Sequence, residues 1–171
     1  AAITQDASWS YESVLPVFKR IEGNTISWLQ NSSVVHGFDG PLFVSEAFRP
    51  YDVLSVVAQT YAAVLDIPLN VDYNSGHQEG ACKSQMTQLR GTRWSAADAF
   101  LKPALARRPS MLNVRSGCQA TRVILNAARV ASQVEYSCDS GKTLQVVSAS
   151  REIILSAGAI GSPALLMLSG I

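Results

Sequence analysis

The sequence predicts a mixed α/β fold, α+β in type, in which helices and loops come first and strands follow. Two observations lead to this prediction. Apolar residues recur with a helical period before about residue 110, and after Pro109 the pattern becomes that of successive strands. The chain has 171 residues, of which 47% are apolar and 16% charged, so it can bury a real core. No internal repeat or low-complexity tract is present.

Composition argues against several kinds of protein. The formal net charge is +1 and no basic run occurs, so nothing favours binding to nucleic acid or to an anionic membrane. The three cysteines, Cys82, Cys118 and Cys138, are far apart and form no CxxC pair, which argues against a zinc or iron–sulfur site. Their odd number leaves at least one without an intrachain partner, and the compartment stays open. The first ten residues lack the pattern of a signal peptide.

The first region begins with a predicted helix, a loop and a short strand. The helix is expected from about Pro16 to a stop at Gly23-Asn24, and the strand at Leu42 to Val44. The apolar side of the helix comprises Val17, Phe18 and Ile21. The segment YDVLSVVAQTYAAVLDIP then predicts a second helix, whose apolar positions include Val53, Val56, Val57 and Val64.

A polar, turn-rich segment, NVDYNSGHQEGACKS, separates the second helix from an extended one, MTQLRGTRW. The next segment, SAADAFLKPALARRP, opens with Ser95 and Asp98 at the spacing of a capping-box variant. Pro103 is expected to kink or restart that helix. After Pro109, three strands are expected in MLNVRSGCQATRVILN, ASQVEYSC and TLQVVSASREIILSA, with DSGK as a hairpin turn between the last two.

The C-terminal segment REIILSAGAIGSPALLMLSGI predicts a strand, a small-residue turn and a helix. Ile153 to Leu155 suit a strand buried on both faces. Ser162 is expected as the N-cap and Pro163 as the first helical residue, with the helix ending at Ser169-Gly170. The turn between strand and helix is built from Ala157, Gly158, Ala159 and Gly161.

Three interpretations of this segment compete. A strand, a bare turn and a helix N-terminus can hold an anionic group such as a cofactor phosphate. The uncharged stretch 153–171 could also be a membrane span, although Pro163, the serines and the glycines argue against it. An ordinary buried β-α unit without a ligand needs the same small residues. From this stretch alone, that interpretation is favoured over a cofactor site.

No familiar catalytic motif is complete in the chain. GxGxxG, GxxxxGK[ST] and G-x-S-x-G are all absent. The two histidines, His36 and His77, lie in polar turn sequence and are interpreted as solvated or turn-stabilising. The carboxylates are interpreted as surface or capping groups and not as an acid–base pair; they are Glu22, Asp39, Asp72 and Glu79.

Five stretches in register nevertheless resemble the glucose-methanol-choline (GMC) oxidoreductases, flavin enzymes of the choline dehydrogenase and aryl-alcohol oxidase kind. They are WSYESVLPVFKRIEGN, HGFDGPLFVS, DIPLNVDYNSGHQEGA, TQLRGTRWSAADAFLKPALARRPSMLNV and REIILSAGAIGSPALLMLSGI. The match extends along almost the whole chain. Three departures concern local turns: Asp66 and Gln133 replace usual glycines, and Ser110-Met111 replaces the usual asparagine.

The resemblance implies a partial FAD/NAD(P)-binding-type GMC fold. Residues 1–110 would be substrate-domain and connecting segments, and residues 111–171 would be part of the FAD-binding domain. The family's Rossmann βαβ with GxGxxG is expected before Ala1, and its catalytic histidine after Ile171, so the chain is expected to be an internal piece of a longer enzyme.

The implied activity is oxidation of a small-molecule alcohol, with FAD as cofactor, and the resemblance places no catalytic residue in this chain. The family's pattern suggests that the Ala120 backbone pairs with the flavin adenine, and that Ala157 and Gly158 lie near its ribose-phosphate portion. The chain alone is expected to be inactive. A non-catalytic remnant that binds no flavin is the alternative, and another flavoprotein such as a hydroxylase is a second one. The particular alcohol, the use of oxygen and the oligomeric state stay open.

Overall fold

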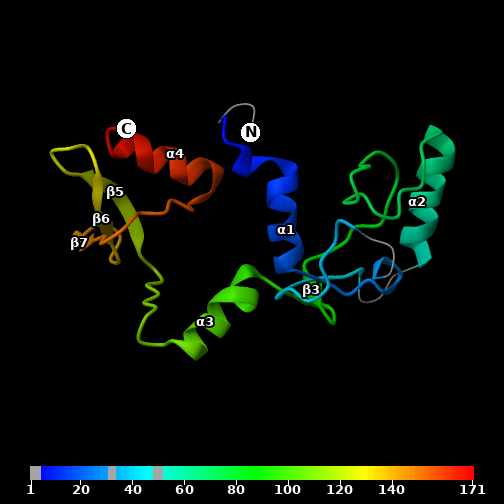
Figure 1. Ribbon diagram of the computed structural model, residues 1–171, viewed down its shortest axis with the longest axis horizontal. Coiled ribbons are helices and arrows are strands. Elements are labelled where there is room, and N and C mark those ends of the chain that lie inside the picture. Colours follow the sequence, from blue (N-terminus) through cyan, green and yellow to red (C-terminus); the bar gives the residue numbers. More distant parts are fainter. Residues whose placement is uncertain (1–4, 31–33, 48–51) are drawn as a thin grey trace. The chain divides into compact units, whose positions relative to one another are not determined.

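The computed structural model describes residues 5–30, 34–47 and 52–171 (Figure 1). Parts of the predicted loop (31–33 and 48–50), Tyr51 and the first four residues lie outside the described residues. The chain divides into two compact units, Ala1–Leu112 and Asn113–Ile171, which are taken separately below. Within the described ranges, no helix has both the length and the apolar character needed to cross a membrane.

The first helix, α1, spans Tyr11–Ile21 and begins earlier than the sequence predicted. A 3₁₀ turn, η1 (Ala7–Trp9), precedes it, and Ser10 caps it by accepting a hydrogen bond from the Ser13 N–H at 3.3 Å. Pro16 therefore lies inside the helix. The prediction placed the start too late because it gave the proline more weight than the serine cap. Val17 and Phe18 on the predicted apolar side are 44% and 60% exposed.

Two parallel strands follow, β1 (Glu22–Asn24) and β2 (Leu42–Val44), and the predicted strand at 42–44 is confirmed. A 3₁₀ turn, η2 (Ser27–Leu29), lies between them in the chain. The glycines of HGFDGP let the loop approach the end of α1 closely. A Cβ at Gly37 would overlap the carbonyl oxygen of Lys19, and one at Gly40 would overlap the backbone of Ile21. Glycine is thus required sterically at both positions.

The second helix, α2, spans Asp52–Leu65 and agrees with the predicted segment. It ends at Asp66, whose φ of +52° is the left-handed conformation usual at a helix C-terminus. Asp66 therefore keeps the backbone shape that glycine, the family's usual residue here, adopts readily. The predicted apolar positions of α2 are all exposed; they are Val53, Val56, Val57 and Val64.

The last part of this unit contains a short hairpin and an interrupted helix. The hairpin strands are β3 (Gln88–Leu89) and β4 (Thr92–Arg93), and a π-helical turn, η3 (Ala97–Leu101), leads into α3 (Lys102–Arg107). The predicted capping box is confirmed, because Ser95 N–H and Oγ both donate to Asp98 Oδ2, at 2.9 and 2.6 Å. Hydrogen bonds from Lys102 and then Ser95 hold the pKa of Asp98 well below its usual value. Pro103, which lacks an N–H, lies in the first turn of α3, where the helix restarts after the π turn.

The second unit is an antiparallel sheet with one helix (Figure 1). The strands lie in the order β5 (Gln119–Leu125), β6 (Ala131–Ser137) and β7 (Gln145–Ser148), and a turn containing DSGK joins the last two, as predicted. The helix α4, Gly158–Leu168, contacts β5. There the Val123 N–H donates to Ser169 Oγ at 2.8 Å.

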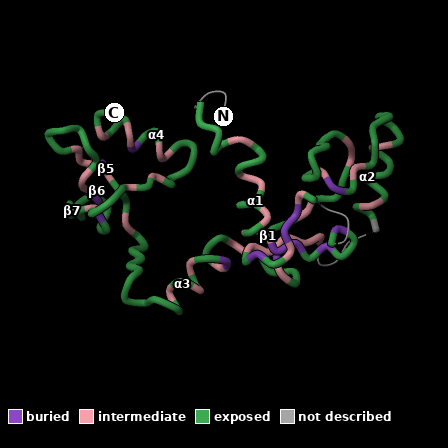
Figure 2. The backbone as a smooth tube through the Cα atoms, in the orientation of Figure 1, coloured by how far each residue is buried: buried purple, intermediate pink, exposed green. Residues whose placement is uncertain are grey.

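Two predictions for the C-terminal segment are wrong. Residues 152–156 form no strand and pair with no strand of this unit, and Ile154 is 77% exposed. The segment that leads into α4 is exposed or intermediate in burial along its length (Figure 2). The helix begins at Gly158 and not after Ser162, which places Pro163 inside it. The Ser162 hydroxyl still accepts a hydrogen bond, from the Ala157 N–H at 2.9 Å.

Candidate functional site

Ala120, predicted to contact a flavin, lies near the start of β5. Its side chain is exposed and its ladder partner is Tyr136. β5 is an edge strand of the three-stranded sheet, so alternate backbone groups on its outer side have no partner from the sheet. The register shifts between Ala120 and Arg122, which marks a bulge at this point.

The bulge is held by hydrogen bonds to Glu135 on β6. Thr121 Oγ1 donates to Glu135 Oε1 at 2.7 Å, and Arg122 donates to Oε2 at 3.0 Å. The hydrogen bond from Thr121, followed by that from Arg122 and the charge of Arg122, lowers the pKa of Glu135. An ionised Glu135 thus fixes the backbone next to Ala120.

Ala157 and Gly158, the other two predicted residues, form the N-terminus of α4. Gly158 has a φ of +85°, and a Cβ built on it meets no atom within 4 Å. Its conformation, and not crowding, therefore favours glycine there. The Ala157 N–H is already used by Ser162 Oγ, whereas the first N–H groups of the helix that follows have no acceptor within the helix.

Within the described ranges, no hydrogen bond joins Ala120 to Ala157 or Gly158. β5 meets α4 through Ser169, at the helix C-terminus, whereas Gly158 begins the helix. At 1.5 Å per residue the two ends of an 11-residue helix are roughly 15 Å apart.

The sequence interpretation missed a buried cluster of charged side chains in the first unit. His36 is 4% exposed and lies between Glu22 of β1 and Asp72 of the following loop. The His36 Nδ1 atom is 2.8 Å from Glu22 Oε1, and Nε2 is 3.2 Å from Asp72 Oδ2. His36 is therefore not solvated and Asp72 is not a surface group, whereas Asp72 does cap its own loop by accepting from the Asn74 N–H at 3.3 Å.

Backbone and amide groups complete the cluster. Glu22 Oε2 accepts from the Gly37 N–H at 3.0 Å, and Asn24, 1% exposed, donates to Glu22 Oε1 at 3.0 Å. Asp72 accepts from Gln85 Nε2 at 3.1 Å. Both ring nitrogens of His36 lie within hydrogen-bonding distance of a carboxylate oxygen, and Nδ1 is also 3.4 Å from Asn24 Nδ2. Such a histidine is suited to joining three chain segments and not to removing a substrate proton.

Spacing in the sequence could not have revealed this cluster. Glu22 and His36 are 14 residues apart, and His36 and Asp72 are 36 apart. The one sequence feature that could have pointed to the cluster was the histidine in HGFDGP. His77, by contrast, is exposed. Across the described ranges, no group of three His, Cys, Asp or Glu side chains is arranged to hold a metal ion.

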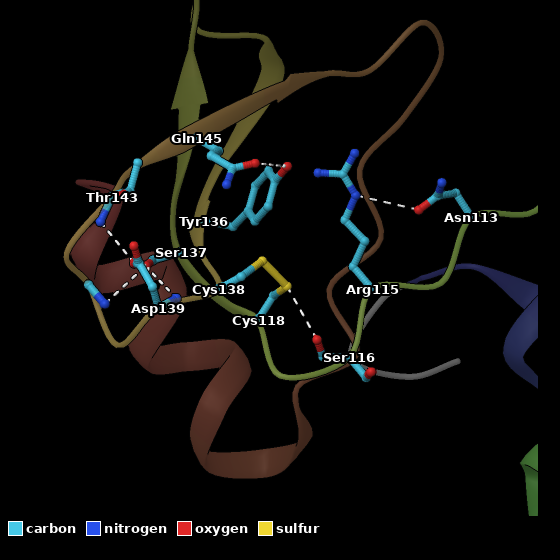
Figure 3. The surroundings of a disulfide bond; sticks show 11 residues. Asn113, Arg115, Ser116, Cys118, Tyr136, Ser137, Cys138, Asp139, Thr143 and Gln145 are labelled. Atoms are coloured by element: carbon cyan, nitrogen blue, oxygen red, sulfur yellow. Dashed lines mark hydrogen bonds between the residues drawn. A yellow bond between two sulfur atoms is a disulfide. The ribbon is translucent and has the colours of Figure 1, made fainter.

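A disulfide between Cys118 and Cys138 is the second feature that the sequence left open (Figure 3). Cys118 immediately precedes β5 and Cys138 immediately follows β6. Cys82 is free and exposed. The bridge lies two residues from Ala120, and the Arg115 guanidinium lies over the Tyr136 ring at 5.1 Å nearby.

Comparison with known proteins gives a consistent result. A sequence model described as GMC oxidoreductase matches residues 4–171. The oxygen-dependent choline dehydrogenase of Sinorhizobium fredii is 40% identical over 168 residues, 95% of this chain and 28% of its own length.

Two solved structures are similar. Pyridoxine 4-oxidase from Mesorbium loti has 32% identity and a TM-score of 0.79, over 97% of this chain and 31% of its own. An FAD-dependent oxidoreductase from Chaetomium thermophilum has 25% identity and a TM-score of 0.82, over 99% of this chain and 30% of its own. The chain thus spans about 30% of the length of these relatives.

Proposed function

The chain belongs to the GMC oxidoreductase family, and on that premise we propose that it is part of an FAD-dependent enzyme that oxidises the CH–OH group of a small alcohol to the aldehyde. A bound flavin would supply the hydride acceptor for this oxidation. The family match over residues 4–171 is the observation that carries the proposal. Residues 1–110 would serve the substrate domain and its connections, and residues 111–171 the FAD-binding domain.

The residues of this chain fit a role in holding the flavin. Space is open beside Gly158, and the left-handed φ there turns the chain so that the first-turn N–H groups of α4 follow at once. Those donors, with the positive end of the helix dipole, suit a phosphate. Ala120 on the edge strand β5 would present its N–H and C=O to the adenine. A dinucleotide is long enough to reach both places.

An alternative role for the small residues is packing of α4 against the sheet. The open space at Gly158 weakens that alternative, because close packing is what would demand a missing side chain. A non-catalytic remnant that binds no flavin is a second candidate function. A helix that is apolar on all sides is normally covered by other parts of a protein. The exposed apolar residues of α4 therefore do not distinguish the packing role from the non-catalytic remnant. They include Ile160, Met167 and Leu168.

The Ala120→Pro variant of the full-length protein tests the adenine contact. Proline has no N–H, so the variant loses about one hydrogen bond to the adenine. Since about 1.4 kcal/mol corresponds to a tenfold change in affinity, FAD retention on ultrafiltration should fall by roughly tenfold. Ala120→Ser keeps the donor and is the matched control. FMN, which lacks the adenine, should bind the variant and the parent alike. Unchanged flavin content in a folded Ala120→Pro protein contradicts the proposed contact.

The 171-residue chain by itself is expected neither to retain FAD nor to oxidise alcohols. It has no Gly-rich turn of the kind that binds a pyrophosphate, which removes a main contact with FAD. Of its two histidines, His36 is held between two carboxylates and is not placed to act as a base on a substrate. Gel filtration after incubation with FAD, followed at the flavin absorbance, and an assay with a panel of primary alcohols measure both properties. A flavin-bound, active preparation of this chain would show that its own residues form a complete site.

A further inference from the structure

We propose that the Cys118–Cys138 disulfide is a reductant-sensitive clamp on the segment that leads into β5, and so on the backbone at Ala120. Gln119 pairs with Ser137, so the two cysteines occupy the next opposed positions of the same ladder. Their Cα atoms are 3.9 Å apart. The clamp itself follows from this arrangement, whereas its effect on flavin retention rests on the proposed function.

The segment before β5, residues 113–118, has little else to hold it. It contains no helix or strand, and residues 113–117 are exposed. Within the segment, Arg115 Nε donates to Asn113 Oδ1 at 3.4 Å and Cys118 Sγ lies 3.5 Å from Ser116 O (Figure 3). Apart from the disulfide, its contact with the sheet is the Arg115 guanidinium over the Tyr136 ring. An exposed cation–π contact stabilises the segment only weakly. A covalent link that closes a loop of this size contributes several times more.

The β6 end of the disulfide is anchored much more firmly. Tyr136 is buried and donates to Gln145 Oε1 at 2.8 Å. Ser137, 4% exposed, donates to Asp139 Oδ1 at 2.7 Å, and Asp139 also accepts from the Thr143 N–H at 2.8 Å. The hydrogen bonds from Ser137 and then Thr143 lower the pKa of Asp139 to about 2. Cleavage of the bridge would therefore free the Cys118 side and leave the Cys138 side in place.

The bridge is open to a dithiol reductant, because Cys138 is exposed and Cys118 is half-buried. One thiolate of the reductant attacks a cysteine sulfur, which breaks the S–S bond, forms a mixed disulfide and releases the other cysteine as a thiol. The second thiol of the reductant then closes its own disulfide and releases the first cysteine. Two electrons and two protons pass from the dithiol to the protein. The new Cys118 thiol has an acceptor nearby, since Sγ is 3.5 Å from Ser116 O.

The test uses the full-length protein with its flavin, before and after treatment with dithiothreitol. Alkylation followed by peptide mass spectrometry counts free thiols at each cysteine, and hydrogen–deuterium exchange reports the backbone of residues 113–125. Reduction should speed amide exchange at the start of β5, residues 119–122, by roughly tenfold or more and leave β7 unchanged. The Cys118→Ser/Cys138→Ser variant should exchange like the reduced protein, with or without dithiothreitol. Cys82→Ser should respond like the parent.

Flavin retention is measured on the same samples by ultrafiltration. Faster exchange with a matching loss of FAD supports the clamp and its coupling to the flavin. Faster exchange with unchanged FAD supports the clamp and counts against the adenine contact at Ala120. Equal exchange in oxidised and reduced protein overturns the clamp, and so does alkylation of Cys118 and Cys138 without reductant.

Discussion

Replacing His36 with alanine should lower the free energy of unfolding by about 2–6 kcal/mol, because two largely buried carboxylates each lose a hydrogen-bond partner, at about 1–3 kcal/mol apiece. The variant leaves Glu22 and Asp72 facing the space that the ring occupied, with both carboxylates largely withdrawn from water. A loss of that size is a large part of the 5–15 kcal/mol that keeps typical domains folded. Urea unfolding of the full-length protein at neutral pH measures it.

His77→Ala is the matched control, because it removes the same residue type from an exposed position. Its effect should stay within about 0.5 kcal/mol. His36→Gln keeps an N–H donor and should recover part of the loss, whereas His36→Phe, which fills the space without a donor, should not. If the urea concentrations at the unfolding midpoint were equal for His36→Ala and His77→Ala, the cluster would contribute nothing to stability.

The Gly37→Ala substitution should destabilise the protein by about 3 kcal/mol or more, the upper end of the range for overpacking. The added methyl group would overlap the carbonyl oxygen of Lys19, and backbone cannot move aside as a side chain can. The shift would also pull the Gly37 N–H from Glu22 Oε2, to which it donates at 3.0 Å. Gly40→Ala should act in the same way against Ile21.

The control for the glycine substitutions is Gly161→Ala in α4. Its Cβ would meet only the Ala157 methyl group, at 3.0 Å, and alanine favours a helix. We expect a change within about 1 kcal/mol, of either sign. Thermal unfolding of the three variants compares them directly. Equal midpoints for Gly37→Ala and Gly161→Ala would mean that the loop and α1 are not held as closely as the backbone geometry indicates.

The elements that depend on neighbouring residues could be predicted from the sequence. The β2 strand, the α2 segment, the Ser95–Asp98 capping box and the β6–β7 turn all follow from the chemistry of a few adjacent side chains. The family could also be recognised, because its five motifs keep their order and spacing along the chain. The roles of Ala120, Ala157 and Gly158 stay predictions, since they concern a ligand.

Other features were decided by the tertiary structure. The run 153–155 has the composition of a buried strand, yet a strand forms only where another strand offers hydrogen bonds, and no strand of this unit pairs with it. The pairing of Cys118 with Cys138 depended on the β5–β6 register. The environment of His36 depended on β1, the HGFDGP loop and the Asp72 loop meeting in space. Periodicity and capping act over a few residues, so no local pattern can show which distant segments will supply the partners of a buried charge.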